Sequence, residues 1–237
     1  MEYLKISKEN LEEYFNVSNI KDKEFKVRIP YGVNSIKINI PFTLNEDIAT
    51  LAGLMPDGSL IKDLRRIYFT QKKDVSKIYL FRDLLCTIFS PSNKIFIKEG
   101  GAETYTNSKT LANFFYHILD LRKSDEETRI PSWIFNSPVS VKYAYLRAAY
   151  DMEAYMSKRL YEIRFITVDK NYAYDLKKLL ESVNITSIVK TRIGGTHKTT
   201  QYRISIYGKE NIKEFGKIGF SIRMHKERLE RALAKYS

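Results

Sequence analysis

The sequence predicts an α+β fold made by tandem duplication, and two observations lead to this class. Helical and alternating apolar patterns follow one another in the same order twice, in units of about 95 residues. Hydrophobic residues make up 43% of the 237, which is enough for a folded core and excludes a disordered basic chain. We therefore expect two successive α-β-α-β-β-α units, each with a sheet that keeps one face free of helices.

Residues 1–43 precede the repeated units and are expected to form an N-terminal extension. The pattern predicts a short helix over Lys8–Tyr14, a turn near Gly32, and a strand over Ile36–Ile40, where apolar and polar residues alternate.

The first repeated unit is expected over residues 44–125, starting with a helix in TLNEDIATLAGLM. Thr43 followed by Glu46 predicts the helix start, and the sequence Pro56-Asp57-Gly58 predicts its end. The later elements expected from periodicity are a strand over 66–71, a helix over 75–88, strands over 94–98 and 102–106, and a helix over 109–119.

A proline-containing connector, residues 126–140, separates this unit from the second, which is expected over residues 141–222. A basic amphipathic helix is expected in residues 223–237. The elements expected in the second unit are a helix over 141–153, a strand over 160–167, a helix over 172–183, strands over 187–192 and 201–207, and a helix over 210–217.

The net charge is the first indication of function. Forty Lys and Arg against 28 Asp and Glu give +12, and so basic a surface attracts a polyanion, most commonly nucleic acid. An acidic protein partner and anionic lipid stay open as alternatives. The single cysteine, Cys86, excludes an intramolecular disulfide and sites made of several thiolates.

The absence of long apolar runs predicts that the chain does not enter a membrane, because spanning a bilayer takes roughly 20 apolar residues. The expected location is intracellular and cytoplasmic, at the nucleoid in a prokaryote, with an organelle also open.

The first helices of the two units agree in detail. Ala-Thr-Leu-Ala-Gly-Leu-Met-Pro-Asp, ending at Asp57, aligns with Tyr-Leu-Arg-Ala-Ala-Tyr-Asp-Met-Glu, ending at Glu153, at an offset of 153 − 57 = 96. Small residues coincide, which would let the two helices cross closely and bring their terminal acids together. An acid at a helix C-terminus is disfavoured by the macrodipole, and a divalent cation between two such acids would offset that cost. Exposed helix-end acids with no such role are the alternative interpretation.

These segments resemble the two motifs of the LAGLIDADG homing endonucleases. Leu51-Ala52-Gly53-Leu54-Met55-Pro56-Asp57-Gly58, followed by the strand near Gln71, is similar to the first motif, and Ala144–Glu153 is similar to the second. The connector Arg129-Ile130-Pro131-Ser132-Trp133-Ile134 is similar to that of the family's archaeal and intein-borne members. The resemblance extends over about residues 44–222.

The resemblance implies an α+β fold of two pseudo-twofold-related units of α-β-β-α-β-β-α type. It also implies a monomer that acts as a pseudo-dimer, with two antiparallel sheets forming a saddle on double-stranded DNA. It implies a site-specific endonuclease that uses Mg²⁺ or Mn²⁺ to hydrolyse both strands of a long, asymmetric target. In this pattern Asp57, Glu153 and the carbonyl oxygens of Pro56 and Met152 are the expected metal ligands. Gln71 is expected near the water network. A basic residue is expected near the scissile phosphate, with Lys158 as the first candidate and Arg159 and Arg164 as alternatives.

The DNA contacts are expected on outward-facing strand residues, because alternate strand positions face opposite sides of a sheet. Those candidates are Arg65, Arg66, Lys94, Lys98, Tyr105, Arg164, Lys190, Arg192, Lys198 and Arg203.

Three departures from the family pattern leave alternatives open. Pro56 lacks the N–H that would close the last helical turn, Met152 replaces a small residue, and Ala154 replaces a glycine that would form a left-handed cap. A catalytically impaired DNA-binding derivative, an intron RNA maturase and an unrelated basic α+β protein are the alternatives to an active nuclease.

Overall fold

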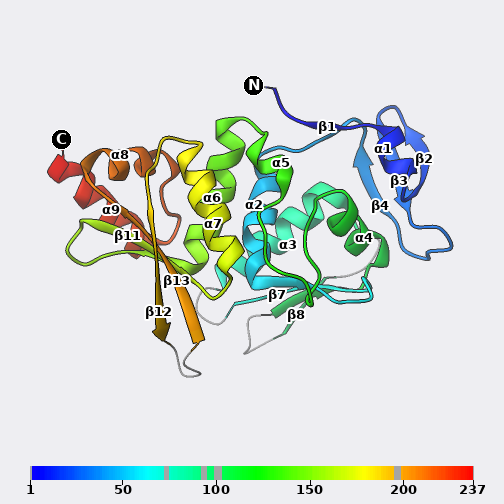
Figure 1. Ribbon diagram of the computed structural model, residues 1–237. Helices are drawn as coiled ribbons and strands as arrows, with labels where there is room; N and C mark the ends of the chain where they lie inside the picture. Colours follow the sequence, from blue (N-terminus) through cyan, green and yellow to red (C-terminus); the bar gives the residue numbers. More distant parts are fainter. Residues whose placement is uncertain (1, 72–74, 92–94, 99–102, 195–198, 237) are drawn as a thin grey trace. The chain divides into compact units, whose positions relative to one another are not determined.

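A computed structural model describes residues 2–71, 75–91, 95–98, 103–194 and 199–236. The chain divides into two compact units, Met1–Glu126 and Glu127–Ser237. In Figure 1 the first unit runs from blue to green and the second from green to red. Among the described residues, no helix combines the length and the apolar character needed to cross a membrane.

Both units contain the same succession of elements, which confirms the predicted α-β-β-α-β-β-α duplication. In the first unit these are α2 (Glu46–Leu54), the 3₁₀ turn η1 (Met55–Asp57), β6 (Gly58–Leu60), β7 (Ile67–Thr70), α3 (Ser76–Phe89), β8 (Ile95–Lys98), β9 (Glu103–Thr106) and α4 (Lys109–His117). In the second they are α6 (Val139–Glu153), β10 (Ala154–Met156), β11 (Glu162–Thr167), α7 (Lys170–Glu181), β12 (Ile188–Gly194), β13 (Thr199–Tyr207) and α8 (Lys209–Ile218), followed by α9 (Arg223–Tyr236).

The two four-stranded sheets have equivalent strand orders and are antiparallel throughout. The orders are β6-β7-β9-β8 in the first unit and β10-β11-β13-β12 in the second. Gly58 pairs with Phe69 in one sheet, and Ala154 pairs with Phe165 in the other. Both pairs are related by the offset of 96 residues that relates the two acids, so the duplication holds at the level of strand register. The crossing of the motif helices and the saddle remain predictions.

One face of each sheet lies in a core, as the period-2 patterns predict. Ile67 and Phe69 of β7 are fully buried, and the Phe69 ring stacks on Phe81 of α3 at a centroid distance of 4.9 Å. In the second unit the buried positions alternate in the same way, with Ile163 and Phe165 on β11 opposite Ile206 and Ile204 on β13. Helices α7 and α8 cover that face of the second sheet.

The first unit opens with small elements that were only partly predicted. They are β1 (Lys5–Ile6), α1 (Lys8–Glu12), β2 (Asn16–Lys21), β3 (Glu24–Arg28), β4 (Ile36–Asn39) and β5 (Phe42–Thr43). Strands β2, β3 and β4 form one sheet, and β1 pairs with β5. Helix α1 and strand β4 confirm the predictions. The β2–β3 hairpin was missed because it has few apolar residues and most of β2 is exposed.

These N-terminal elements share the core of the first unit. Phe15 and Phe42 are buried, and their rings lie 6.0 and 5.2 Å from the ring of Phe114 in α4. The Thr110 hydroxyl at the start of α4 donates to the carbonyl of Asn34 at 2.6 Å. The segment before α2 is therefore packed against α4 and hydrogen-bonded to it.

The start of α2 differs from the prediction. Thr43 was expected to cap this helix, but it lies in β5 paired with Lys5. Asn45 is the N-cap, and its side-chain oxygen accepts a hydrogen bond from the Ile48 N–H at 3.2 Å. The prediction of Thr43 as the N-cap is wrong because the backbone of Thr43 pairs with Lys5 in a strand. Asn45, two positions later, is an equally good capping residue.

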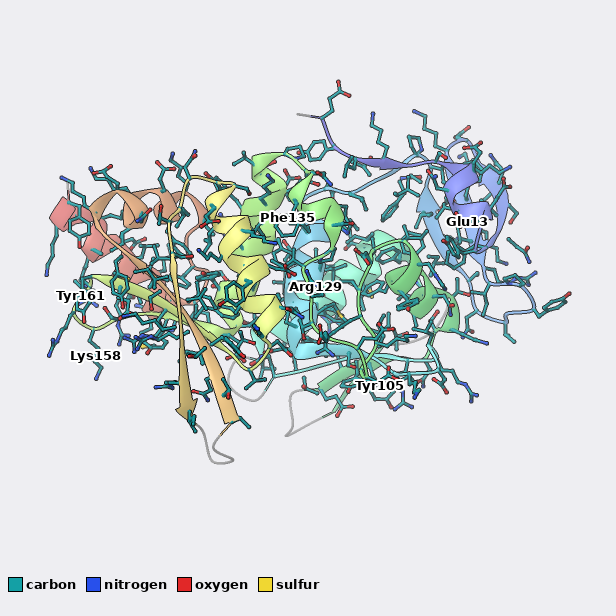
Figure 2. All side chains as sticks on the ribbon, viewed as in Figure 1. Glu13, Tyr105, Arg129, Phe135, Lys158 and Tyr161 are labelled. Carbon is teal, nitrogen blue, oxygen red and sulfur yellow. The ribbon has the colours of Figure 1, made fainter. Side chains whose placement is uncertain are left out.

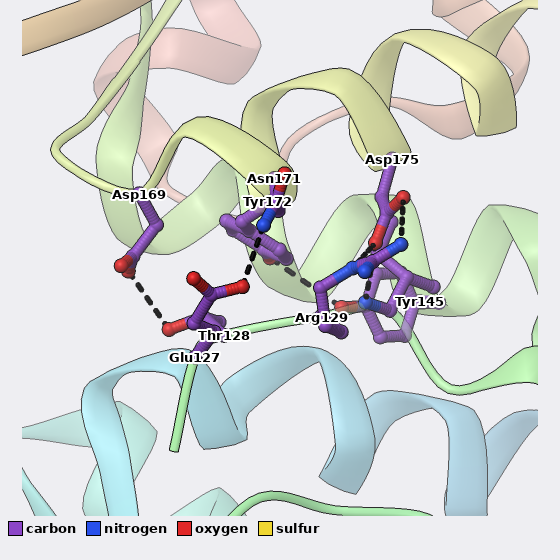
Figure 3. A network of polar contacts seen from close by, with 9 residues as sticks. Glu127, Thr128, Arg129, Tyr145, Asp169, Asn171, Tyr172 and Asp175 are labelled. Atoms are coloured by element: carbon purple, nitrogen blue, oxygen red, sulfur yellow. Dashed lines mark hydrogen bonds and ion pairs between the residues drawn. The ribbon is translucent and has the colours of Figure 1, made fainter. Parts of the chain in front are cut away.

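The connector is held against α7 by a polar network. Arg129 forms a bidentate ion pair with Asp175, and the Thr128 hydroxyl donates to Asp169 at 2.8 Å, as Figure 3 shows. The Asn171 amide donates to Glu127 at 2.5 Å. The connector also contains the short helix α5 (Ser132–Phe135). Residues 127–135 thus belong structurally to the second unit.

Candidate functional site

Asp57 is the last residue of η1, where the motif helix of the first unit ends. Helix α2 stops at Leu54, and the Met55 N–H bonds to the Ala52 carbonyl three residues back. The helix therefore tightens into a 3₁₀ turn, with Pro56 in its first positions, where a missing N–H does no harm. Pro56 was expected to loosen the last helical turn, and this expectation is wrong, because the chain closes an ordered 3₁₀ turn in which the Gly58 N–H bonds to the Met55 carbonyl.

The Asp57 carboxylate is partly buried and is held by one amide. Gln71 Nε2 donates to Asp57 Oδ2 at 2.7 Å. Burial raises the pKa of Asp57, and the hydrogen bond from Gln71 only partly opposes this. Removing water from a carboxylate disfavours its charged form, and a cation beside it would favour that form again. The structure thus brings together two predicted site residues at the end of the same sheet.

Gly58 fixes the chain immediately after Asp57. A Cβ at this position would lie 3.0 Å from the Tyr68 carbonyl oxygen and 3.1 Å from Met55 Sδ. Its φ is −99°, so close approach to β7, and not left-handed geometry, requires the glycine. Because Gly58 pairs with Phe69, this approach also places Asp57 near the end of β7, where Gln71 follows.

Glu153 occupies the equivalent place in the second unit. It is the exposed last residue of α6, and Ala154 begins β10 as Gly58 begins β6. Thr167 is the equivalent of Gln71 by register, and its hydroxyl accepts a hydrogen bond from the Asp169 N–H at 3.1 Å. Met152, which precedes Glu153, is partly buried.

A left-handed cap is absent at Ala154, as expected, but the alanine is not the reason. Ala154 has φ −105° and ψ 165°, which is extended backbone that alanine adopts readily. Gly58 is also extended, with φ −99° and ψ −177°. Neither motif helix uses the left-handed cap, because the chain passes straight into a strand.

The donor set at these two helix ends fits a hard divalent cation. Both side chains are carboxylates, and the residues before them, Pro56 and Met152, contribute carbonyl oxygens. Magnesium and manganese prefer oxygen ligands and keep several waters, so each helix end offers donors of the preferred kind. No cluster of three or more His, Cys, Asp or Glu residues that could hold a metal occurs in the described part of the chain.

Lys158 is not brought to Glu153. It lies exposed in the turn between β10 and β11, and Figure 2 places it at that turn with Tyr161. Strand β10 separates the two residues, so Glu153 precedes the strand and Lys158 follows it. Within the second unit this lysine stands at the opposite end of the strand from the acid.

The open face of the first sheet contains Tyr105, opposite Tyr68 on β7 (Figure 2). Arg66 lies over the Tyr105 ring at 4.8 Å and donates to Asn107 at 2.7 Å. Arg65 is exposed and pairs with Asp63 at 3.0 Å. Lys94 lies outside the described residues, and Lys98 is described only as the last backbone position of β8.

The open face of the second sheet contains four of the residues that were predicted to contact DNA. Arg164, Lys190, Arg192 and Arg203 all lie opposite the core face, since Phe165 and Ile204 between them are buried. Lys190 stands directly opposite Arg203, and the Arg203 Nε is buried without a hydrogen-bond partner among the described residues. Like charges in directly opposed positions destabilise a sheet unless an anion binds. Lys198 lies outside the described residues.

Glu162 is a residue of this face that the sequence interpretation missed. Its side chain is only 1% exposed and pairs with Arg164, which also donates to the Tyr155 hydroxyl at 2.7 Å. Ser205 and Tyr207 donate to the same carboxylate at 2.7 and 2.8 Å. The available signal was the spacing of Glu162 and Arg164, because residues two apart on a strand share a face.

One family model matches most of the second unit. Residues 140–219 match the model of the LAGLIDADG-like domain.

Among curated proteins, the chain is 29% identical over 226 residues to the "Probable translation initiation factor IF-2" of Methanocaldococcus jannaschii, covering 92% of this chain and 19% of that protein. It is 29% identical over 112 residues to the tRNA-splicing ligase RtcB of Pyrococcus furiosus, covering 41% and 11%. It is 22% identical over 132 residues to a DNA gyrase subunit of Mycobacterium leprae, covering 50% and 10%. The chain thus spans a fifth or less of the length of these relatives.

Two solved structures show the fold. The homing endonuclease I-DmoI in complex with DNA and Mn matches with a TM-score of 0.52 and 19% identity, over 74% of this chain and 97% of that one. Full-length DUF199/WhiA from Thermatoga maritima matches with a TM-score of 0.52 and 16% identity, over 84% and 63%. Residues 140–219 are therefore similar in sequence to the LAGLIDADG-like domain, and the duplicated fold of the chain is similar to that of these two structures.

Proposed function

We propose that the chain is a site-specific DNA endonuclease that makes metal-dependent double-strand breaks. The observation that supports this most directly is the matched backbone setting of Asp57 and Glu153. Each acid ends a motif helix, and the residue after it pairs with a phenylalanine of the next strand. A carboxylate retained at the same register in both halves is what two-strand cleavage needs, since each strand presents one phosphodiester.

The proposed divalent ion, Mg²⁺ or Mn²⁺, would neutralise phosphate charge and lower the pKa of an attacking water. The residues that would supply ligands are Asp57 with the carbonyl oxygen of Pro56 in the first unit, and Glu153 with that of Met152 in the second. Gln71 keeps the Asp57 carboxylate in one orientation through its 2.7 Å hydrogen bond. Lys158 has no support from the structure as a group near the scissile phosphate, so the proposal does not include it.

Double-stranded DNA is the proposed substrate, bound by the chain as a monomer. The open face of the second sheet supports this, because Lys190, Arg192 and Arg203 lie together there. Arg66 and Tyr105 supply a cation and an aromatic ring on the first sheet. I-DmoI, which shares the fold, has been solved with DNA and Mn.

We also propose that the chain is a mobile module. Its relatives are an initiation factor, an RNA ligase and a DNA gyrase subunit by name, and it matches only a segment of each. A segment that recurs within proteins of unrelated function behaves as an insert, and an endonuclease activity supplies the break by which such an insert spreads.

The test is cleavage of a plasmid library with a randomised duplex insert, followed by sequencing of the cut ends. Cuts at one long sequence with Mg²⁺ or Mn²⁺, and none with EDTA, are expected. Asp57→Asn and Glu153→Gln should each lower the cutting rate by about 100-fold or more, since metal stabilisation of the transition state amounts to several kcal/mol. Asp125→Asn, which removes only an exposed partner of Lys62, is the control.

A second function is distinguished by the same experiment. The fold also occurs in DUF199/WhiA, so the fold alone does not assign cleavage. If the wild-type protein binds one sequence tightly but does not cut it in the presence of any metal ion, the chain is a noncatalytic DNA-binding derivative and the nuclease proposal is wrong.

A further inference from the structure

The second sheet places an ionised carboxylate among cations on its open face. Glu162 alternates with the core residues of β11, yet its side chain is nearly inaccessible to water. Burial on its own would raise the pKa of Glu162, but the hydrogen bonds from Arg164, Ser205 and Tyr207 outweigh it and hold that pKa below its ordinary value. An acid on a surface that attracts phosphate needs an explanation, because it repels the same ligand.

The explanation begins with the donors of Arg164. Its Nε donates to Glu162 Oε1 at 3.0 Å, and its Nη2 donates to Glu162 Oε2. Its Nη1 donates to the Tyr155 hydroxyl at 2.7 Å. A guanidinium has five N–H groups, so these three bonds leave two, one on each terminal nitrogen. A side chain that is 25% exposed can present that remaining pair to a ligand in a fixed orientation.

The charge balance indicates what kind of ligand suits this arrangement. Glu162 and Arg164 together carry no net charge, so the pair is poorly suited to neutralising phosphate. Lys190 and Arg203, on neighbouring strands of the same face, have no ion pair among the described residues. A neutral but rigid pair of donors suits a neutral bidentate acceptor, and the major-groove edge of guanine offers two acceptors, O6 and N7.

We propose that Arg164 reads a guanine base in the major groove, and that Glu162 and Tyr155 are positioning residues that hold its guanidinium for this contact. Lys190 and Arg203 supply the phosphate contacts beside it. This inference rests on the proposed function, because it assumes that the open face binds duplex DNA.

The test is selection of bound sequences from a pool of randomised 24-base-pair duplexes, in EDTA so that no strand is cut. The proteins compared are the wild type, Arg164→Gln, Glu162→Gln, Tyr155→Phe and the control Lys190→Gln. Arg164→Gln should lose a preference for guanine at one position, roughly 10- to 100-fold, while other positions keep theirs. Lys190→Gln should select the same sequence as the wild type and bind it with lower affinity.

The positioning residues have a signature that a structural role would not produce. Glu162→Gln leaves the Arg164 charge uncompensated, so binding to nonspecific duplex should tighten while the preference at that same position falls. Tyr155→Phe should weaken the preference less, because it removes one bond of three. This variant keeps the test valid if Glu162→Gln fails to fold.

The selection distinguishes failure of the proposed function from failure of the inference about Arg164. If the wild type enriches no sequence, the proposed function fails. If the wild type enriches a sequence and Arg164→Gln enriches the same one unchanged, or loses affinity equally for all sequences, Arg164 is a phosphate contact and the inference is overturned.

Discussion

At the scale of single residues, Gly58 shows how local packing sets the site. The neighbour that a Cβ would meet at 3.0 Å is the backbone carbonyl of Tyr68, which cannot rotate away. Gly58→Ala should therefore cost roughly 1–3 kcal/mol of unfolding free energy and shift Asp57 relative to Gln71. Urea unfolding measures the first effect and the metal-dependent cutting rate measures the second.

The control for this substitution is Gly194→Ala. A Cβ there would meet the far end of the Gln201 side chain at 2.8 Å, which can swing aside. Its cost should stay within about 0.5 kcal/mol. Equal costs for the two substitutions would contradict the argument from the Tyr68 carbonyl.

Glu162 gives the residue-scale prediction for pH. Because its pKa is lowered in the folded protein, its contribution to stability is complete above the unfolded value near 4.5 and is lost as pH falls through the folded value. The difference in Tm between the wild type and Glu162→Gln should be constant from pH 6 to 8 and should shrink below about pH 4.5. Thermal unfolding across this range measures it.

A second variant separates the ion pair from the acid itself. In Arg164→Gln the carboxylate loses its principal donor, so the pKa of Glu162 in the folded protein rises toward its unfolded value. The acid-dependent loss of stability should then be smaller, because it spans the interval between these two values. An unchanged pH profile in this variant would show that Arg164 does not set the ionisation of Glu162.

At the scale of elements, the connector is held mainly by one buried carboxylate. Asp175 accepts hydrogen bonds from the Arg129 guanidinium and from the Ile130 N–H at 3.3 Å. Asp175→Asn should cost about 1–3 kcal/mol, nearer the lower end because the Arg129 side chain is 57% exposed. Limited proteolysis should also cut residues 126–130 faster, since the segment loses its attachment to α7.

Asp125→Asn is again the matched control, because its partner Lys62 is 80% exposed. Its effect should be within about 0.5 kcal/mol. If both substitutions leave proteolysis at the connector unchanged, the polar network does not fix this segment.

The elements also show what the sequence could predict. Periodicity located the long helices and strands, because each has several buried residues at regular spacing. Strands β6 and β10 were not located separately, since three residues are too few for a period of two to appear. Asp57 and Glu153 were identified because they recur at one offset, whereas Glu162 was not, because burial of a strand acid depends on Ser205 and Tyr207 from a distant segment.

At the scale of the whole molecule, the charge of +12 has two possible modes of action. It acts either as a diffuse field or through a few phosphate contacts on the sheets. Several cations are already paired with acids, as Lys8 is with Glu12 and Lys217 with Glu214. Lys190 and Arg203 form no such pair among the described residues. The second mode therefore predicts that these two residues make the largest contribution to the salt dependence of DNA binding.

Two double variants of equal net charge decide between the modes. Lys190→Gln with Arg203→Gln, and Lys8→Gln with Lys217→Gln, each reduce the charge from +12 to 12 − 2 = +10. Binding to a random-sequence duplex, followed by fluorescence anisotropy between about 50 and 200 mM salt, gives the slope of log K against log salt. The first double variant should reduce that slope by about 1.8, or 0.9 for each lost phosphate contact, and the second should leave it unchanged. Equal slopes in the two variants would mean that the charge acts as a diffuse field and that the second sheet is not the phosphate-binding surface.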